Sequence, residues 1–112
     1  MNQFSPIPII WEDKKFPGSY FKEQEYEILN RFAERFNQRF PIMNIEVHVD
    51  FTNNSADKIK FFDIKLHVRL KNGKILIGTA QNKSIQQGLR EAITFIKHEA
   101  DRYEKHLNKN KR

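Results

Sequence analysis

The chain has no cysteine, and it has only four glycines and four prolines in 112 residues. Without cysteine there is no disulfide, no thiolate zinc site and no cysteine nucleophile. Apolar residues nowhere form a run of the ~18 residues that a membrane-spanning helix requires. The N-terminal stretch MNQFSPIPIIWEDKK also lacks the basic segment and the small-residue cleavage site of a secretory signal. We therefore expect a cytoplasmic protein that is neither secreted nor membrane-spanning.

Positive charge is in excess. Twenty Lys and Arg residues against fourteen Asp and Glu give a net charge of +6 and a pI near 9.7. Such a balance favours an anionic partner, most plausibly a nucleic acid. The alternative is a basic surface that serves only solubility. The length of 112 residues suits one domain over residues 1–112, with a loose extension at 1–6 and a frayed basic tail at 108–112.

Hydrophobic periodicity predicts two helices and four strands. Apolar residues recur at helical spacing in two stretches, and they alternate with polar residues in three others. The predicted order is a short strand within 7–16, a helix over 21–40 that starts near Ser19 or Tyr20, strands over 43–51, 61–71 and 74–80, and a final helix after Ser84. This is an α+β fold of order β-α-β-β-β-α, in which two helices cover one face of a four-stranded sheet.

Local signals define the connections between these elements. Asn72 and Gly73 separate two alternating runs, which predicts a two-residue hairpin turn of type I′. The segment 52–58 (TNNSADK) is polar and predicts a loop. Ser84 followed by Gln87 predicts a capping box at the start of the last helix. The apolar stripe predicted for that helix is Ile85, Leu89, Ala92, Ile93, Ile96, Ala100, Tyr103 and Leu107.

Basic residues are spaced as ridges along both predicted helices. On the first helix, Arg31, Arg35 and Arg39 recur every four residues and share one face. Two ridges of this kind suit the phosphates that line an RNA groove, whereas the neighbouring acidic residues favour a merely solvated surface. The excess of positive charge favours binding. The predicted RNA-binding residues are Arg31, Arg35, Arg39, Arg90, Lys97, His98, Arg102, Lys105 and Lys109.

Two catalytic or metal-binding alternatives have weaker signals. Asp50, followed on the next strand by Asp63 and Lys65, resembles the Asp and Asp-x-Lys pattern of Mg²⁺-dependent nucleases. This pattern also arises by chance on any polar strand face, and no helical catalytic glutamate accompanies it. His48 and His67 lie on neighbouring predicted strands, but two histidines without a clear third ligand are more typical of a polar surface. We therefore expect no enzyme, no cofactor and no metal.

A resemblance to a known family covers nearly the whole chain, from Ile7 to Arg112. It is carried by LNRFAERFNQRFPIMNIEVHVD and by DIKLHVRLKNGKILIGTAQNKSIQQGLREAITFIKHEADRYEKHLNKNKR. These segments resemble the ribosome hibernation-promoting factor and ribosome-associated inhibitor family. That family has a β-α-β-β-β-α domain, similar in shape to double-stranded RNA-binding domains, and a last helix that ends in a lysine-rich segment.

The resemblance implies a function without chemistry. It implies a short-form translation inhibitor of stress or stationary phase that binds the small ribosomal subunit and its 16S-type rRNA in the messenger and transfer RNA channel. It implies contacts through both helices, no small-molecule substrate, no membrane, and a monomer off the ribosome. Phe95 and His98 depart from the family, because they stand where a basic residue is expected. The rival interpretation of the same outline is a stand-alone double-stranded RNA-binding domain, although only Lys83 stands where that module clusters lysines.

Overall fold

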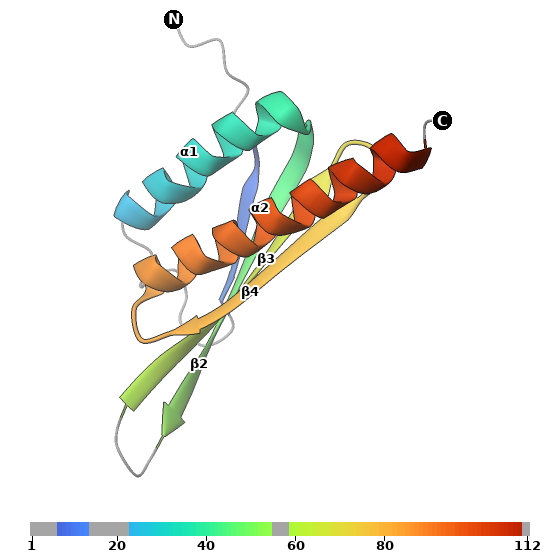
Figure 1. The fold of residues 1–112 in the computed structure, drawn as a ribbon. Coiled ribbons are helices and arrows are strands. Elements are labelled where there is room, and N and C mark those ends of the chain that lie inside the picture. The colour runs from blue at the N-terminus through green and yellow to red at the C-terminus, as the bar shows by residue number, and fades with distance from the viewer. Residues whose placement is uncertain (1–6, 14–22, 55–58, 111–112) are drawn as a thin grey trace, which may run out of the picture.

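The described part of the chain forms one four-stranded sheet and two helices (Figure 1). The computed structural model describes the backbone of residues 7–13, 23–54 and 59–110, and the side chains of residues 7–10, 23–50 and 61–107. The elements are, in order, β1 (Ile9–Asp13), α1 (Glu23–Arg39), β2 (Ile42–Asn54), β3 (Ile59–Leu70), β4 (Ile75–Asn82) and α2 (Ile85–Asn110). The predicted α+β class and the order β-α-β-β-β-α are therefore confirmed.

The sheet is mixed, with its strands in the order β1-β2-β3-β4. β1 runs parallel to β2, and the other neighbouring strands are antiparallel. A parallel pair requires a crossover connection, and the segment that contains α1 provides it. Both helices lie on the same face of the sheet, with α1 against β2 and α2 against β3 and β4 (Figure 1). Neither helix has both the length and the apolar character needed to cross a bilayer.

Alternation along the strands separates the core from the open face of the sheet. Ile45 and Val47 of β2 and Leu66 of β3 are 0 % exposed, and they point toward the helices. The residues between them in sequence point to the opposite face, because successive side chains of a strand alternate. Within the described residues, the polar side chains on the open face include Glu46, His48, Asp50, Asp63, Lys65, His67, Arg69, Thr79 and Gln81.

Aromatic and small residues position the two helices. Phe32 and Phe36 of α1 are buried with their ring centroids 5.1 Å apart, as their helical spacing predicts. At the start of α2, the hydroxyl of Ser84 accepts a hydrogen bond from the backbone N–H of Gln87 (3.2 Å), which confirms the predicted cap. Gly78 of β4 allows α2 to approach closely, because a β-carbon there would collide with the helix.

Several details differ from the prediction. The β3–β4 loop has three residues, because Leu70 N–H donates to the carbonyl of Lys74 (2.8 Å) and Gly73 N–H donates to the carbonyl of Leu70 (3.0 Å). Gly73 has a positive φ of 95°. A type I turn that ends in a left-handed glycine also suits the Asn-Gly pair. β2 extends to Asn54, because its ladder with β3 continues through three residues that were predicted as loop.

The last helix also differs from the prediction. The backbone of α2 is helical through Asn110, inside the tail predicted to fray, and Leu107 of the predicted stripe is 38 % exposed because it lies beyond the sheet-covered part of the helix. The predicted N-terminal extension 1–6, the first-helix cap near Ser19 or Tyr20 and residues 111–112 lie outside the described residues.

Candidate nucleic-acid interface

A groove lies between α1 and α2, on the side of the helices that faces away from the sheet. It has a volume of about 870 Å³. Its floor is apolar, with Phe32 and Phe36 from α1 and Ile93 from α2. Each helix packs one apolar stripe on the sheet and the adjacent flank against the other helix. The apolar side chains of these two flanks form the floor. The rim above this floor is therefore left to polar side chains from two segments that are far apart in the sequence.

Five of the nine predicted RNA-binding residues line this groove. They are Arg31, Arg35 and Arg39 from α1 and Arg90 and Lys97 from α2. The three arginines share one face of α1 because their four-residue spacing is close to one helical turn. Arg90 and Lys97 are seven residues apart, or about two turns, and they face α1 from the opposite rim. The packing of the two helices thus brings five cationic side chains to one concave surface.

Arg39 is committed to an ion-pair cluster that bridges the two helices. Its guanidinium donates to Asp101 (2.7 Å) and to Glu104 (2.5 Å) on α2. It also lies over the ring of Phe40, 5.1 Å from the centroid. The pKa of Arg39 is raised, chiefly by the hydrogen bond to Glu104, and the pKa of Asp101 is lowered, chiefly by the hydrogen bond from Arg39. Arg39 therefore connects the helices, and its charge is already compensated.

Arg35, Arg90 and Lys97 have no such compensation. Among the described residues, none of the three makes an ion pair, and all three are exposed. Arg31 differs, because it pairs with Glu27 one turn earlier (3.0 Å). We refer to Arg35, Arg90 and Lys97 as the uncompensated triad. An anion in the groove can bind these three cations without displacing an internal partner.

The second predicted ridge lies outside the groove. His98, Arg102 and Lys105 are exposed on α2 and do not line the groove. Arg102 pairs with Glu99 (3.2 Å), which lowers its net contribution to the surface charge. The side chain of Lys109 lies outside the described residues, although its backbone belongs to α2. The predicted set thus separates into groove residues and a ridge on another part of the α2 surface.

The residues of the nuclease alternative do share one surface. Asp50 and Asp63 are directly paired across β2 and β3, and Lys65 follows on the same face. They line a depression of about 690 Å³ on the open face of the sheet. Asp63 also accepts a hydrogen bond from the side-chain amide of Gln81 (2.9 Å). Within the described residues, the two aspartates are not part of any group of three side chains placed to share a metal ion.

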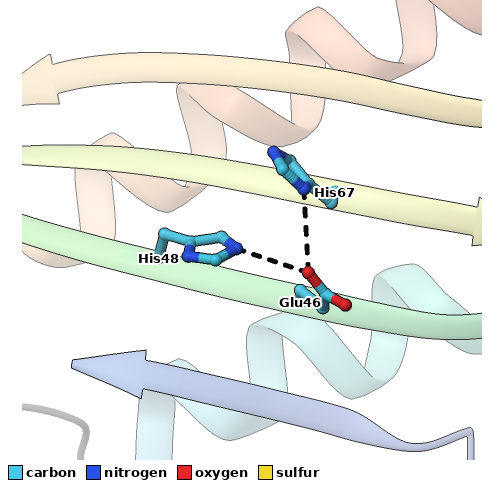
Figure 2. A group of neighbouring side chains, drawn as sticks. All are labelled: Glu46, His48 and His67. Atoms are coloured by element: carbon cyan, nitrogen blue, oxygen red, sulfur yellow. Dashed lines mark hydrogen bonds and ion pairs between the residues drawn. The ribbon is translucent and has the colours of Figure 1, made fainter. Parts of the chain in front are cut away.

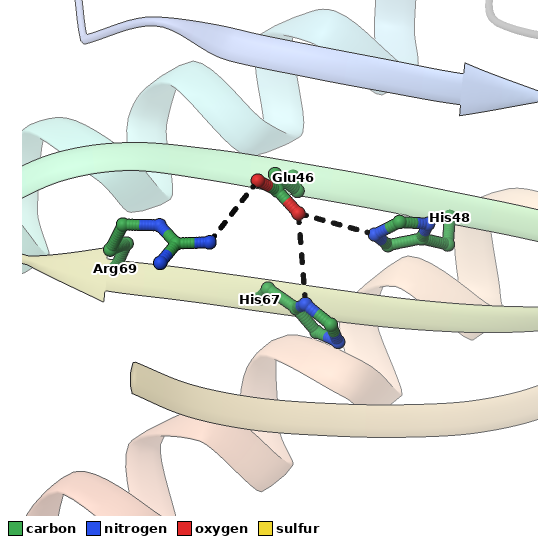
Figure 3. Close-up of polar contacts among 4 residues, drawn as sticks. All are labelled: Glu46, His48, His67 and Arg69. Atoms are coloured by element: carbon green, nitrogen blue, oxygen red, sulfur yellow. Dashed lines mark hydrogen bonds and ion pairs between the residues drawn. The ribbon is translucent and has the colours of Figure 1, made fainter. Parts of the chain in front are cut away.

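A group of three side chains that are placed to share a metal ion lies beside these two aspartates. Glu46 and His48 on β2 and His67 on β3 bring one ligand atom each to within 4.8 Å of the others. Figure 3 shows Glu46 between the two histidines and Arg69, which approaches the other carboxylate oxygen at 3.4 Å. The hydrogen bond with His48 is the main cause that lowers the pKa of Glu46, whereas burial is the main cause that lowers the pKa of His67. Sequence reasoning noted the histidines but did not identify Glu46 as a possible third ligand.

No model of a known protein family matches the chain. No curated protein matches it either.

Proposed function

We propose that this protein binds the small ribosomal subunit in the channel of messenger and transfer RNA and inhibits translation by occupying it. The observation that carries the proposal is the groove between α1 and α2, which gathers five cationic side chains from two helices. Ribosomal RNA presents closely spaced phosphates, and guanidinium and ammonium groups bind phosphate oxygens while counterions are released. The resemblance to the hibernation family supports the same surface, since it implies contacts through both helices.

The uncompensated triad is the part of the groove that favours an external anion most. A surface cation that already has an acidic partner gains less from a phosphate, because the internal ion pair must be loosened first. Arg35, Arg90 and Lys97 have no ion-pair partner among the described residues. Arg31 and Arg39 flank the triad and widen the positive rim. The exposed side chains of Arg102 and Lys105 extend the basic surface along α2 toward its C-terminal end.

Inhibition by occupancy requires affinity and shape, and it requires no reaction. The two helices and the groove between them form a rigid surface, because Leu29, Phe36, Leu89 and Ile96 anchor the helices in a common core. Such a surface competes with messenger and transfer RNA for the same phosphates. The partner in this proposal is 16S-type rRNA, and neither a cofactor nor a small-molecule substrate takes part.

Co-sedimentation with purified small subunits and whole ribosomes through a sucrose cushion tests this function. We expect saturable binding of about one protein per subunit, suppressed by added messenger and transfer RNA and weakened by salt. Replacing the uncompensated triad, Arg35, Arg90 and Lys97, by Glu is expected to abolish co-sedimentation and leave the fold intact, because all three side chains are exposed. Circular dichroism of the variant checks that it folds.

A matched triple reversal elsewhere controls for net charge. Lys65, Lys71 and Lys74 are exposed and lie outside the groove and the ridge, so their replacement by Glu changes the charge equally. We expect this control to keep most of the binding. Equal loss of ribosome binding in the test variant and in this control would mean that only net charge matters, and it would contradict a defined interface. If the wild-type protein stays in the supernatant but shifts long duplex RNA, its partner is duplex RNA and not the ribosome.

A further inference from the structure

The open face of the sheet carries a cluster of two histidines and one glutamate. Glu46 and His48 are two residues apart on β2, so their side chains point to the same face. His67 on β3 is the register partner of Glu46. Figure 2 shows the three side chains in front of the strands, while the helices lie behind the sheet. The cluster is therefore on the opposite side of the sheet from the helix groove.

One oxygen of Glu46 lies near both imidazole rings. Glu46 Oε1 is 3.4 Å from His48 Nε2 and 3.7 Å from His67 Nδ1. The two rings are neighbours, with centroids 4.9 Å apart. Arg69 approaches the other oxygen, Oε2, at 3.4 Å. The arginine thereby holds the carboxylate in the orientation that directs Oε1 toward the histidines.

These separations are close to those of a metal-bound ligand set. Zn²⁺ binds imidazole nitrogen and carboxylate oxygen at about 2.0–2.2 Å in tetrahedral geometry, which places its ligand atoms roughly 3.3–3.5 Å apart. The two contacts of Glu46 Oε1 fall at or just beyond this range, and all three ligand atoms lie within 4.8 Å of one another. A small rotation of the imidazole rings completes the convergence. No backbone movement is needed, since register pairing already brings the two strands together.

The chemistry of the surroundings favours a divalent transition metal. Neutral imidazole and carboxylate form ligand sets for Zn²⁺, whereas Mg²⁺ and Ca²⁺ prefer oxygen alone. The three side chains are only 22–32 % exposed, which limits competition from water. Asp50 and Asp63 lie on the same face, so together with Glu46 the acidic groups outnumber Lys65 and Arg69. Burial lowers the pKa of His67 and thus favours its neutral, metal-binding form.

We infer that Glu46, His48 and His67 form a binding site for a divalent transition-metal ion such as Zn²⁺. Three protein ligands leave the fourth position of a tetrahedral ion open toward the depression on the sheet face. The ion joins β2 to β3, the two central strands of the sheet. This site is independent of the proposed ribosome interface, because it uses the other face of the sheet and none of the groove residues.

Titration of the metal-free protein with ZnCl₂ in an isothermal calorimeter at neutral pH tests the site. We expect one ion per chain and a rise in melting temperature when Zn²⁺ is present, because a ligand that binds only the folded state stabilises it. His67→Gln and Glu46→Gln are expected to weaken Zn²⁺ binding by roughly tenfold or more, since each replaces a ligand by a weakly coordinating amide and changes even to the partners of ligands cost about 10- to 100-fold. Binding of Co²⁺ is expected to give the visible absorption of a four-coordinate ion, and excess Mg²⁺ is expected not to compete.

The histidines of α2 supply the matched control. His98→Gln removes an exposed imidazole far from the cluster, and it is expected to leave Zn²⁺ affinity unchanged. Metal-free variants are compared with the wild type by thermal unfolding, so that a folding defect is distinguished from a lost ligand. The inference is overturned if the wild type binds no Zn²⁺, or if folded His67→Gln binds Zn²⁺ as tightly as the wild type. It is also overturned if His98→Gln and His67→Gln weaken binding equally, which would mean nonspecific binding by surface histidines.

Discussion

The distinction between compensated and uncompensated cations can be measured as a salt dependence. Two triple variants remove the same formal charge from the helices. The first replaces the uncompensated triad, Arg35, Arg90 and Lys97, by Gln. The second replaces three helix arginines whose ion pairs lie within the described residues, Arg31, Arg39 and Arg102, by Gln. If the proposed ribosome interface is correct, the first variant loses phosphate contacts that the second largely retains.

The magnitude follows from counterion release. Each phosphate contact contributes about 0.7 to 0.9 to the slope of log affinity against log salt, so three contacts contribute about 2 to 3. Between about 50 mM and about 200 mM salt, that difference corresponds to roughly 20- to 40-fold in affinity. We therefore expect the salt-induced loss of ribosome affinity to be smaller by this factor in the triad variant than in the wild type. The ion-paired variant is expected to change the slope by less than about 1.

Binding of fluorescently labelled protein to purified small subunits, measured by anisotropy at several salt concentrations, gives both slopes. Thermal unfolding of each variant is a necessary control, because Arg39 connects the two helices through Asp101 and Glu104. A slope that falls equally in the two variants would refute the reasoning, since internal ion pairs would then make no difference to phosphate binding. A slope that is unchanged in the triad variant would remove the groove from the interface.

Two further predictions concern stability. Gly78→Ala is expected to destabilise the fold by about 1–3 kcal/mol in urea denaturation, because its added β-carbon would collide with the backbone carbonyl oxygen of Ala92 in α2. Gly88→Ala is the comparison and is expected to cost less, since its β-carbon meets the terminal methyl group of Ile64 and no backbone atom, and alanine favours the helix. Asp101 has a lowered pKa because Arg39 donates to it, so its contribution is present at neutral pH and is lost as the pH falls below about 4. The difference in unfolding free energy between the wild type and Asp101→Asn is therefore expected to shrink in acid, and a constant difference would contradict the role of the ion pair.

The fold was predictable from the sequence because its signals are local. Alternation at Ile45, Val47 and Val49 marks a half-buried strand whatever its neighbours are, and the buried residues confirm it. The extension of β2 was not predictable in this way. Thr52–Asn54 have the composition of a loop, but their backbone groups continue the ladder with β3, and ladder pairing does not depend on side-chain type. Tertiary pairing therefore overrode local propensity at this end of the strand.

The groove was predictable only in part. Spacing alone places Arg31, Arg35 and Arg39 on one face of a helix. Which residues of α2 face them depends on how the two helices pack, and the sequence does not specify this. The structure brings Arg90 and Lys97 to the groove and leaves His98, Arg102 and Lys105 outside it. The ion pair of Arg39 with Asp101 joins residues 62 positions apart, so no local pattern indicates it.

The pairing of Glu46 with His67 in the cluster of Glu46, His48 and His67 could have been predicted from one further sequence signal. The alternating polar residues of β2 have even numbers and those of β3 have odd numbers, and they share one face of the sheet. Residues directly opposite each other on the two strands point to the same face, so an even-numbered residue of β2 must pair with an odd-numbered residue of β3. A loop over 52–58 centres the hairpin on residue 55, so even-numbered residues of one strand would pair with even-numbered residues of the other. That pairing would place polar residues opposite apolar ones. Moving the loop to the four residues between Asn54 and Ile59 gives the observed pairing, which sets Glu46 directly opposite His67. The polarity pattern of both strands thus constrains the loop length, and it was sufficient to exclude the loop predicted from composition.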